Sequence, residues 1–497
     1  MTRTLLQTAA ALVLAVTYCS GQPTRADDPA TARLPFAVEW EEVKPEPPLP
    51  GLQSYCVAAV GDNWLVFAGR VAGLHGFNPT KGNFPRPSAN TTMFLIDPKA
   101  AKVLGKLDVT TLGAELGGPL SATNVQWVQD RDTVYAIGGY GMDLTTEKMV
   151  TFDTVIRFSA GKVAALLAVG EAKPAAYKPL FAVAHDTRLK ITGGELKKFG
   201  DNFLLVFGQT FDGEYSPGVD RYNRLYGEQQ QYSQKVRAFN LGSDLSVKNY
   251  ALFDGGFDTS LPYNRRDLNV VDVIRPDGTP GLQVYGGVFK AGQVAGHTTP
   301  IEIDVPAKAP PAAKVKWVKT YDQALSHYDC AYLTVFDPAS KSTYTTLFGG
   351  ISQYYYDRDK NKLVRDKVDL TPPNIVDGLP FIKTASVLRR DANGEYAQFI
   401  LPTDLPGYIG SEARFVPSPS VTAFSNGVLD LSKMNGRTQV GAVFGGIESN
   451  QPYGSWPTGK TNASRRLFRI WLTPGASPAI PMPPLPAPTP LIVPKVP

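Results

Sequence analysis

The chain has few of the residues that usually carry catalysis or cross-links. Its 497 residues include three cysteines and four histidines. Only Cys56 and Cys330 lie outside the N-terminal segment, and two cysteines in so long a chain are not a disulfide framework. GxSxG, HExxH, CxxC, phosphate-loop and dinucleotide-binding motifs are all missing. The sequence therefore offers no recognisable catalytic motif, and we expect no cofactor and no bound metal.

A large excess of positive charge is missing too. The net charge is +5, and setting aside Arg3 and Arg25 leaves +3, with no stripe of lysine and arginine. We therefore do not expect a nucleic-acid partner. Beyond the N-terminus no apolar run is long enough to cross a membrane, and no helix-period pattern of useful length occurs. Glycine (46 residues) and proline (42) are plentiful instead, which is typical of many short strands joined by turns. We expect a monomer.

The first 26 residues have the pattern of a signal peptide. Arg3 supplies a positive start, Leu5 to Val16 form an apolar run, and small residues allow cleavage near Ala26. Two alternatives are a buried N-terminal helix and a lipid anchor at Cys19, although Tyr18 stands where lipoprotein signals have a small residue. We expect export to the periplasm, the cell envelope or the medium, with a linker over residues 27–35.

One pattern recurs six times along the chain. An apolar run ends in a Gly-Gly pair or a near match, at intervals of 63 to 96 residues. Another apolar run precedes each pair, and a strand–turn–strand pattern follows it, so each repeat predicts four strands. The six pairs, two of which have another residue in place of one glycine, are Ala68-Gly69, Gly138-Gly139, Gly208-Gln209, Gly286-Gly287, Gly349-Gly350 and Gly445-Gly446.

These repeats resemble the kelch repeat, and the chain resembles the galactose oxidase central domain over residues 36–473. Ala68 and Gln209 each replace one glycine, and the outer-strand tryptophan appears only at Trp317 and at Trp40. The resemblance implies an all-β fold, a six-bladed kelch-type β-propeller with four-stranded blades; seven blades are the less favoured alternative. It also implies that the paired glycines stand where backbones approach closely near the ring axis.

The two ends of the chain bear on how the ring closes. The sixth repeat lacks a fourth strand, because residues 474–497 contain ten prolines and we expect them to form a disordered tail. Near the N-terminus, Phe36–Val43 resembles the outer strand Lys314–Val318. We therefore expect this N-terminal segment to complete the sixth blade.

Two groups of residues resemble parts of known metal sites. Galactose oxidase binds copper through histidines and a cysteine-linked tyrosine, and Tyr328, Cys330 and Tyr332 lie beside His327. The four histidines are dispersed, however, so packing is the favoured role. Asp357 to Asn361 has the opening spacing of a calcium loop, but Lys362 replaces its glycine and Val368 its glutamate. A solvated turn is therefore the preferred interpretation.

The candidate ligand site rests on charged residues that precede the first strand of a repeat. In a propeller these residues ring one mouth of the central channel, where they could meet a ligand or simply pair with each other. Long aromatic loops after the Gly pairs (residues 210–233, 351–380 and 447–464) would share that face. The candidate ligand-binding residues are Arg265, Arg266, Asp267, His327, Asp329, Glu412 and Arg414.

Three functions fit this reading. The favoured one is an exported binding or interaction module for a glycan or a protein, because flat aromatic side chains beside a few charges suit sugars and peptides. The alternatives are a carbohydrate-active enzyme, a sugar mutarotase or oxidase, and a scaffold with the proline-rich tail as a spacer.

Overall fold

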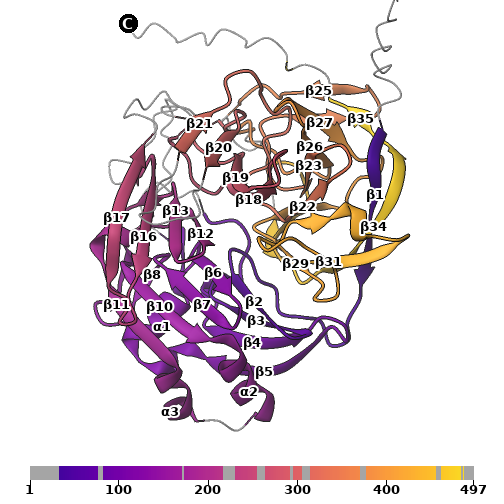
Figure 1. The fold of residues 1–497 in the computed structure, drawn as a ribbon. Helices are drawn as coiled ribbons and strands as arrows, with labels where there is room; N and C mark the ends of the chain where they lie inside the picture. The colour runs from indigo at the N-terminus through magenta and orange to yellow at the C-terminus, as the bar shows by residue number, and fades with distance from the viewer. Residues whose placement is uncertain are drawn as a thin grey trace, which may run out of the picture.

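The protein is an all-β chain in a computed structural model that describes residues 33–76, 82–170, 173–215, 230–254, 263–290, 295–304, 314–369, 376–454, 460–482 and 485. The predicted signal peptide lies outside these residues. Six sheets, each built on four antiparallel strands, follow one another along the chain (Figure 1). Their strands occur at all six predicted repeats.

Each of the six sheets has four strands in its repeating unit. Sheet 1 holds β2 (Cys56–Val60), β3 (Asn63–Phe67), β4 (Thr92–Asp97) and β5 (Lys102–Asp108). Sheet 2 holds β6 (Gln126–Asp130), β7 (Thr133–Ile137), β10 (Thr154–Ser159) and β11 (Phe181–His185). Sheet 3 holds β12 (Glu195–Phe199), β13 (Asn202–Val206), β16 (Lys235–Leu241) and β17 (Val247–Asp254).

The other three sheets repeat this order. Sheet 4 holds β18 (Asn269–Ile274), β19 (Pro280–Tyr285), β20 (Ile301–Asp304) and β21 (Lys314–Trp317). Sheet 5 holds β22 (Tyr332–Asp337), β23 (Ser342–Phe348), β26 (Ala385–Arg390) and β27 (Tyr396–Ile400), with β30 (Leu429–Asp430) and β35 (Ile480–Pro481) added at its two edges. Sheet 6 holds β29 (Arg414–Pro417), β31 (Thr438–Phe444), β34 (Leu467–Pro478) and β1 (Arg33–Val43).

Short sheets, helices and 3₁₀ turns form in the connections between the main strands. After four of the Gly pairs the chain forms short sheets, made of β8 (Tyr140–Asp143) with β9 (Lys148–Thr151), β14 (Gln209–Thr210) with β15 (Gln231–Tyr232), β24 (Tyr355–Asp357) with β25 (Lys362–Val364), and β28 (Tyr408–Ser411) with β32 (Ile447–Ser449) and β33 (Thr461–Ala463). The described residues include the helices α1 (Ala114–Leu120), α2 (Ala160–Val169) and α3 (Pro174–Tyr177), and 3₁₀ turns at Arg86–Ser88, Val109–Leu112, Lys178–Leu180, Thr187–Leu189 and Leu431–Lys433.

The helix α2 was not expected from the sequence. Ser159 caps its first turn by accepting a hydrogen bond from the Lys162 N–H, and Gly170 ends it in the left-handed conformation. Its apolar residues Val163 and Leu167 are buried in the core between sheets 1 and 2. At ten residues it is too short for its periodicity to stand out, so tertiary packing rather than pattern fixes it.

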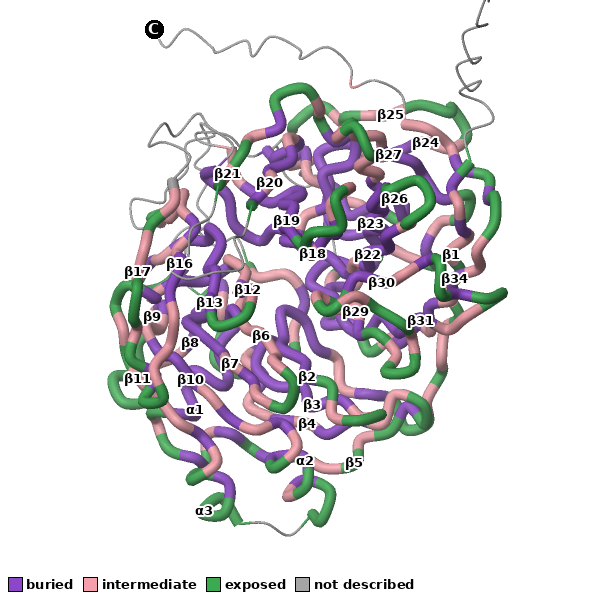
Figure 2. The backbone as a smooth tube through the Cα atoms, in the orientation of Figure 1, coloured by how far each residue is buried: buried purple, intermediate pink, exposed green. Residues whose placement is uncertain are grey.

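The six sheets pack on one another in a cycle. Six of the buried apolar clusters in the described part of the chain each join two neighbouring sheets. One of them joins sheet 6 to sheet 1, where Phe444 packs on Tyr55 and Trp64. The first strand of each sheet lies innermost and the fourth outermost, and buried positions follow the inner and middle strands (Figure 2). This arrangement is compatible with the expected β-propeller.

The Gly pairs lie where successive sheets touch. At Gly349 a Cβ atom would lie 2.1 Å from the Ile409 carbonyl oxygen, in the segment leading to sheet 6. Both glycines of a pair have positive φ, 62° and 88° at Gly349 and Gly350. In the third repeat Phe207 (φ 53°) takes the first glycine's place and Gly208 (φ 87°) the second's. The replaced glycine there is therefore the first one, not the second as the alignment on Gln209 assumed.

The N-terminal strand pairs with the C-terminal strand, as predicted. β1 runs antiparallel to β34 from Arg33, opposite Pro478, to Val43, opposite Leu467. Leu34 and Phe36 on β1 are buried, and Phe36 packs edge-on against Tyr344 of sheet 5, with ring centroids 5.5 Å apart. The strand begins at Arg33, so the last three residues assigned to the linker belong to it.

The predicted tail boundary at Thr473 is wrong. β34 continues to Pro478, and β35 then pairs with β27 on the outer edge of sheet 5. Prolines are tolerated here because these are edge positions, where a missing N–H removes few ladder hydrogen bonds. Among the described residues no helix is long and apolar enough to cross a membrane.

Candidate functional site

Six residues, one before the first strand of each sheet, are linked in series by five backbone hydrogen bonds. The N–H groups of Gly193, Asp267, Asp329, Glu412 and Ser54 donate in turn to the carbonyl oxygens of Asn124, Gly193, Asp267, Asp329 and Glu412, at 3.3, 2.7, 3.0, 2.7 and 3.3 Å. We call this set the central ring. Five members, all but Asp329, have φ between 49° and 66°. This left-handed conformation is costly for most residues, so the surrounding packing must hold it.

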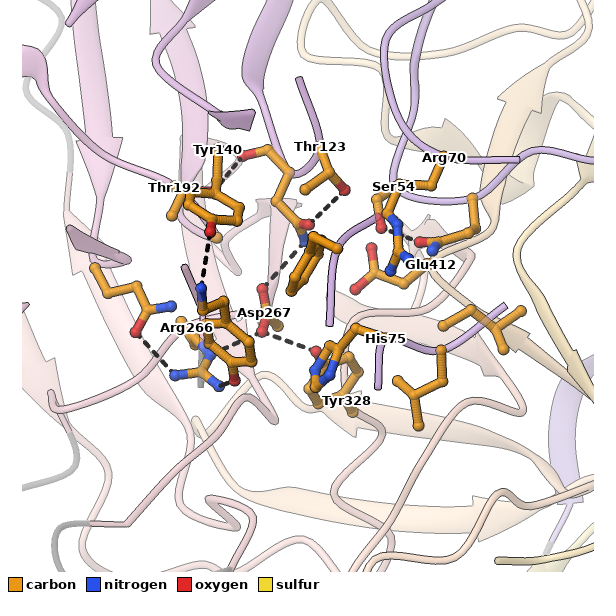
Figure 3. Close-up of a pocket in the computed structure, with 18 of the residues that line it drawn as sticks. Ser54, Arg70, His75, Thr123, Tyr140, Thr192, Arg266, Asp267, Tyr328 and Glu412 are labelled. Carbon is orange, nitrogen blue, oxygen red and sulfur yellow. Dashed lines mark hydrogen bonds and ion pairs between the residues drawn. The ribbon is translucent and has the colours of Figure 1, made fainter. Parts of the chain in front are cut away.

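The central ring brings three carboxyl groups from successive sheets together. Asp267, Asp329 and Glu412 occupy adjacent ring positions and are each at most 8% exposed. Side chains on one side of the ring line a cavity of about 50 Å³, which we call the mouth pocket (Figure 3). Inner strands on the other side line a cavity of about 470 Å³, which we call the channel. The ring residues therefore stand between two compartments.

Two of the candidate residues have structural roles. Arg265 is fully buried, and its guanidinium donates to the carbonyl oxygens of Gly286 and Thr299 at 2.9 and 3.0 Å. His327 lies between the Gly349 carbonyl oxygen (2.6 Å) and the Ser386 hydroxyl (2.7 Å). Burial lowers the pKa of His327 to about 4, so it is neutral at pH 7. Neither residue lines either cavity.

Arg266 and Asp267 line the mouth pocket, but their polar atoms are largely engaged. Arg266 donates to Asp267 (3.1 Å) and to four further oxygens at 2.8 to 2.9 Å, those of Gln209, Gln230, Tyr232 and Tyr215. Asp267 also accepts from the Tyr328 hydroxyl at 2.8 Å and from the Asn124 amide at 3.2 Å. The pair therefore holds sheets 2 to 5 together beneath the pocket.

Asp329 and Arg414 face the channel rather than the mouth pocket. The Arg414 guanidinium grips the Asp329 carboxylate through two hydrogen bonds of 2.8 and 3.1 Å. Burial by itself would lower the pKa of Arg414, but Asp329 outweighs it and the pKa rises. This paired arrangement is the self-neutralising alternative that the sequence left open for the ring of charges.

Glu412 is the exception among the ring carboxyls. It is 3% exposed, and its Oε2 atom has no hydrogen-bond partner. Burial, followed by the neighbouring Asp329 and Asp267 carboxylates, raises the pKa of Glu412 well above its ordinary value, while Arg414 and Ser54 oppose the shift. The structure therefore places in the mouth pocket a carboxyl group that favours its protonated form.

The candidate list omitted Arg70, which lies beside Glu412 in the mouth pocket (Figure 3). Arg70 is 5% exposed, donates to the Ser88 hydroxyl at 3.2 Å and lies 4.5 Å from the centre of the Phe84 ring. Its Nε atom has no partner, and no carboxylate of the described residues lies within ion-pair distance of it. Burial lowers the pKa of Arg70 only to about 10, so the guanidinium stays charged at pH 7.

A sequence signal for Arg70 existed. It directly follows the first Gly pair, and the residues in the same position of the other five repeats are Tyr140, Gln209, Val288, Ile351 and Ile447. Arg70 is the one charged residue of this set. Arg70 follows the second strand of its repeat, whereas the predicted site residues precede or begin a first strand.

Aromatic side chains form one wall of the mouth pocket. Tyr140 stacks on Phe211 with ring centroids 4.5 Å apart, and Phe84 meets Tyr140 and Tyr215 edge-on at 5.3 Å. His75 stacks on Phe84 at 5.2 Å. Two of these rings, Phe211 and Tyr215, come from the predicted aromatic loop 210–233. That loop therefore contributes to the site.

The other two aromatic loops mainly pack on neighbouring loops. Tyr354 is buried against Leu325 and Ile382, and the Tyr453 hydroxyl donates to Asp366 at 2.9 Å. Tyr222, Tyr226 and Trp456 lie outside the described residues. The predicted calcium-like turn is the tip of the β24–β25 hairpin, where Asp357 pairs with Lys360. Within the described ranges no group of three or more potential metal ligands occurs.

The channel has its own charged network. Lys197 Nζ lies 3.1 Å from Asp272, 3.2 Å from the Tyr332 hydroxyl and 3.7 Å from Glu195. Burial raises the pKa of Glu195 to about 7 despite the nearby Lys197. Most of these charges are paired, so the network neutralises the channel wall.

Comparisons with known proteins identify little. No protein-family profile matches the chain, and no curated protein matches it. Among solved structures, one described as "Structure of YjhT" matches with a TM-score of 0.44 and 10% sequence identity, covering 84% of this chain and 99% of that one.

Proposed function

We propose that the chain is a six-bladed, kelch-type β-propeller that is exported and binds a small acidic sugar in its mouth pocket. The proposed fold is supported by the backbone hydrogen bonds between neighbouring sheets. The N–H groups of Gly69, Gly139, Gly208, Gly350 and Gly446 donate to carbonyl oxygens in the segment that leads into the next sheet, and for Gly446 that segment leads into sheet 1. With the six inter-sheet cores, these contacts favour a closed ring of six blades.

The observation that carries the ligand class is the environment of Arg70. A buried guanidinium is normally paired with a carboxylate, because an isolated buried charge is unfavourable. Among the described residues Arg70 has no such partner, and the acid whose charge acts on it, Glu412, favours the neutral form. Arg266 and Asp267 neutralise each other. The mouth pocket thus has one uncompensated positive charge, which an anionic ligand group would balance.

The size and walls of the pocket indicate which part of the ligand enters. A cavity of about 50 Å³ has room for roughly three or four water-sized groups, enough for a carboxylate and one neighbouring substituent. The aromatic wall offers apolar faces suited to the C–H face of a sugar ring. We infer that the acidic end of a sugar enters the pocket while the rest stays over the loops.

The test is calorimetric binding of glucuronate, galacturonate and the matching neutral sugars. Arg70→Gln should weaken binding of the acid by about 10- to 100-fold, the range expected for loss of a hydrogen-bonded charge pair. Arg86→Gln is the matched control, because Arg86 lies on the same loop with a side chain 62% exposed. If neutral sugars bind as well as acids, or if both variants bind alike, the assignment fails. Binding of a peptide instead would favour a protein partner.

A carbohydrate-active enzyme is the second candidate, and Glu412 is the observation that favours it. A carboxyl group kept protonated at neutral pH is what a general acid requires. Glu412 could then protonate a ring or glycosidic oxygen next to the bound carboxylate. Following anomer interconversion of the bound acid by NMR would distinguish the two candidates, since a pure binder leaves its rate unchanged.

A further inference from the structure

The central ring holds more carboxyl groups than cations that contact them. Asp267 is paired with Arg266 at 3.1 Å and Asp329 with Arg414 at 2.8 Å. Glu412 is the third carboxyl and has no cation within ion-pair distance among the described residues. Its backbone N–H is bound to the Asp329 carbonyl oxygen, so the two residues are held side by side. Asp267 and Asp329 each hold the arginine that contacts them, so Glu412 is the carboxyl whose ionisation is opposed by burial and by two neighbouring carboxylates.

The Glu412 oxygen without a hydrogen-bond partner, Oε2, indicates that this carboxyl is the protonated one. An ionised carboxylate needs hydrogen-bond donors at both oxygens when it is buried, and Glu412 Oε2 has none. The groups that act on Glu412 are the carboxylates of Asp329 and Asp267, the guanidinium groups of Arg414 and Arg70, the hydrogen-bonding Ser54, and the neutral Tyr328 and Cys330. Burial and the two carboxylates disfavour a charge on Glu412 more than Arg414 favours it.

We propose that Glu412 carries a proton at neutral pH and donates it, as a hydrogen bond, to the anionic oxygen of the ligand. The ligand part of this inference rests on the proposed function, while the protonation of Glu412 does not. With Glu412 neutral, the mouth pocket offers two donors to one oxyanion, the Glu412 hydroxyl and the Arg70 guanidinium. An ionised Glu412 would instead repel that oxyanion.

The proposal implies that the affinity for the acidic ligand falls at alkaline pH. Raising the pH until Glu412 ionises removes one donor and adds a like charge, so affinity for the acid should fall. Glu412→Gln replaces the protonated acid by an amide of the same shape, which still donates a hydrogen bond and does not titrate. That variant should lose the alkaline decline in affinity, because no group at this position ionises.

The first experiment uses the ligand-free protein. Infrared spectra in heavy water should show a protonated-carboxyl band that persists at about pH 8.5 and is absent from Glu412→Gln. Glu195→Gln is the matched control, because Glu195, with a pKa near 7, should be mostly ionised at that pH and the band should survive its replacement. A band unaffected by Glu412→Gln, or no band at all, overturns the proposal.

The second experiment measures galacturonate and glucuronate binding between about pH 6 and pH 10 for the wild type and Glu412→Gln. An alkaline loss of affinity confined to the wild type supports the proposal, and identical pH profiles contradict it. If the wild type binds no acid while the infrared band is present, the proposed function fails and the proton on Glu412 stands. Thermal denaturation of each variant checks that it is folded.

Discussion

The backbone N–H of Gly446 donates a 2.8 Å hydrogen bond to the carbonyl oxygen of Leu52, although 394 residues separate them in the sequence. The same type of contact joins earlier sheets to their successors, for example Gly139 to Ile191 at 2.8 Å. The last sheet is thus joined to the first by the same type of hydrogen bond, from the second glycine of a Gly pair, that joins the earlier sheets. The N-terminal strand β1 adds a second connection by pairing with β34.

Loss of β1 should destabilise the whole protein. Phe36 is fully buried between sheets 5 and 6, so Phe36→Ala should lower the free energy of unfolding by about 3–5 kcal/mol. Deleting residues through Val43 should also expose the edge of β34 and cause self-association. Urea denaturation and light scattering measure the two effects. Glu41→Ala, at an exposed position of the same strand, is the control; a truncated protein that stays monomeric with an unchanged Tm would refute the role of β1.

The part of the C-terminal segment that the structure describes, through Leu485, should stabilise the fold. Met482 and Leu485 pack against the cluster around Tyr354, and Ile480 pairs with Ile400. Truncation after Leu485 should leave the Tm unchanged, whereas truncation after Thr473 should lower it by several degrees because it removes the end of β34 and all of β35. Equal melting temperatures for the two truncations would show that this segment contributes nothing.

Arg266 and Arg70 should respond differently to substitution. Arg266→Ala removes five hydrogen bonds and leaves Asp267 buried without its cation, so it should cost about 3–5 kcal/mol of stability. The Arg70 side chain donates one hydrogen bond, to Ser88, so Arg70→Gln should lower the free energy of unfolding much less than Arg266→Ala does. Chemical denaturation of both variants tests this. A larger loss for Arg70→Gln would make Arg70 a structural residue.

Cys56 and Cys330 are both free and buried, Cys56 at the start of β2 and Cys330 two residues before β22. Burial raises the pKa of both thiols, which keeps them protonated and unreactive. Alkylation followed by mass spectrometry should modify neither residue in the native protein and both after unfolding without a reductant. Detection of a Cys56–Cys330 disulfide would contradict the sheet order.

Stability should fall as the pH rises from about 4.5 to 7, in part because of Glu195. Its pKa is raised from 4.5 to about 7 in the folded protein, so the folded state binds a proton that the unfolded state has already lost in this range. Urea titrations at several pH values should show a smaller decline for Glu195→Gln than for the wild type. The same slope in both proteins would mean that Glu195 titrates normally.

The repeating framework could be predicted from the sequence because each repeat has the same local pattern, an apolar run followed by a Gly pair. The apolar run before Gly349-Gly350 and the positive φ of both glycines belong to a geometry that recurs, so six weak signals agree. The end of β34 and the helix α2 escaped prediction because tertiary pairing, not local propensity, fixes them. Proline content alone wrongly suggested a tail from Pro474 onward.

The candidate site was predicted only by its location. The residues before the first strands do converge, but sequence could not tell Arg266, whose donors are engaged by five oxygens, from Arg70, whose Nε has no partner. That difference depends on side chains from Gln209, Tyr215 and Tyr232, which are distant in sequence. Likewise Asp329 and Glu412 look equivalent in the sequence, and only the position of Arg414 separates them.

A crystal structure of the protein with a bound uronic acid would show where the ligand lies. The account predicts the carboxylate of the sugar in the mouth pocket, within hydrogen-bond distance of both Arg70 and the Glu412 carboxyl, with the ring against Tyr140 or Phe84. A sugar bound in the channel beside Lys197 and Asp272, or on the outer face of any sheet with the mouth pocket left to solvent, would contradict it.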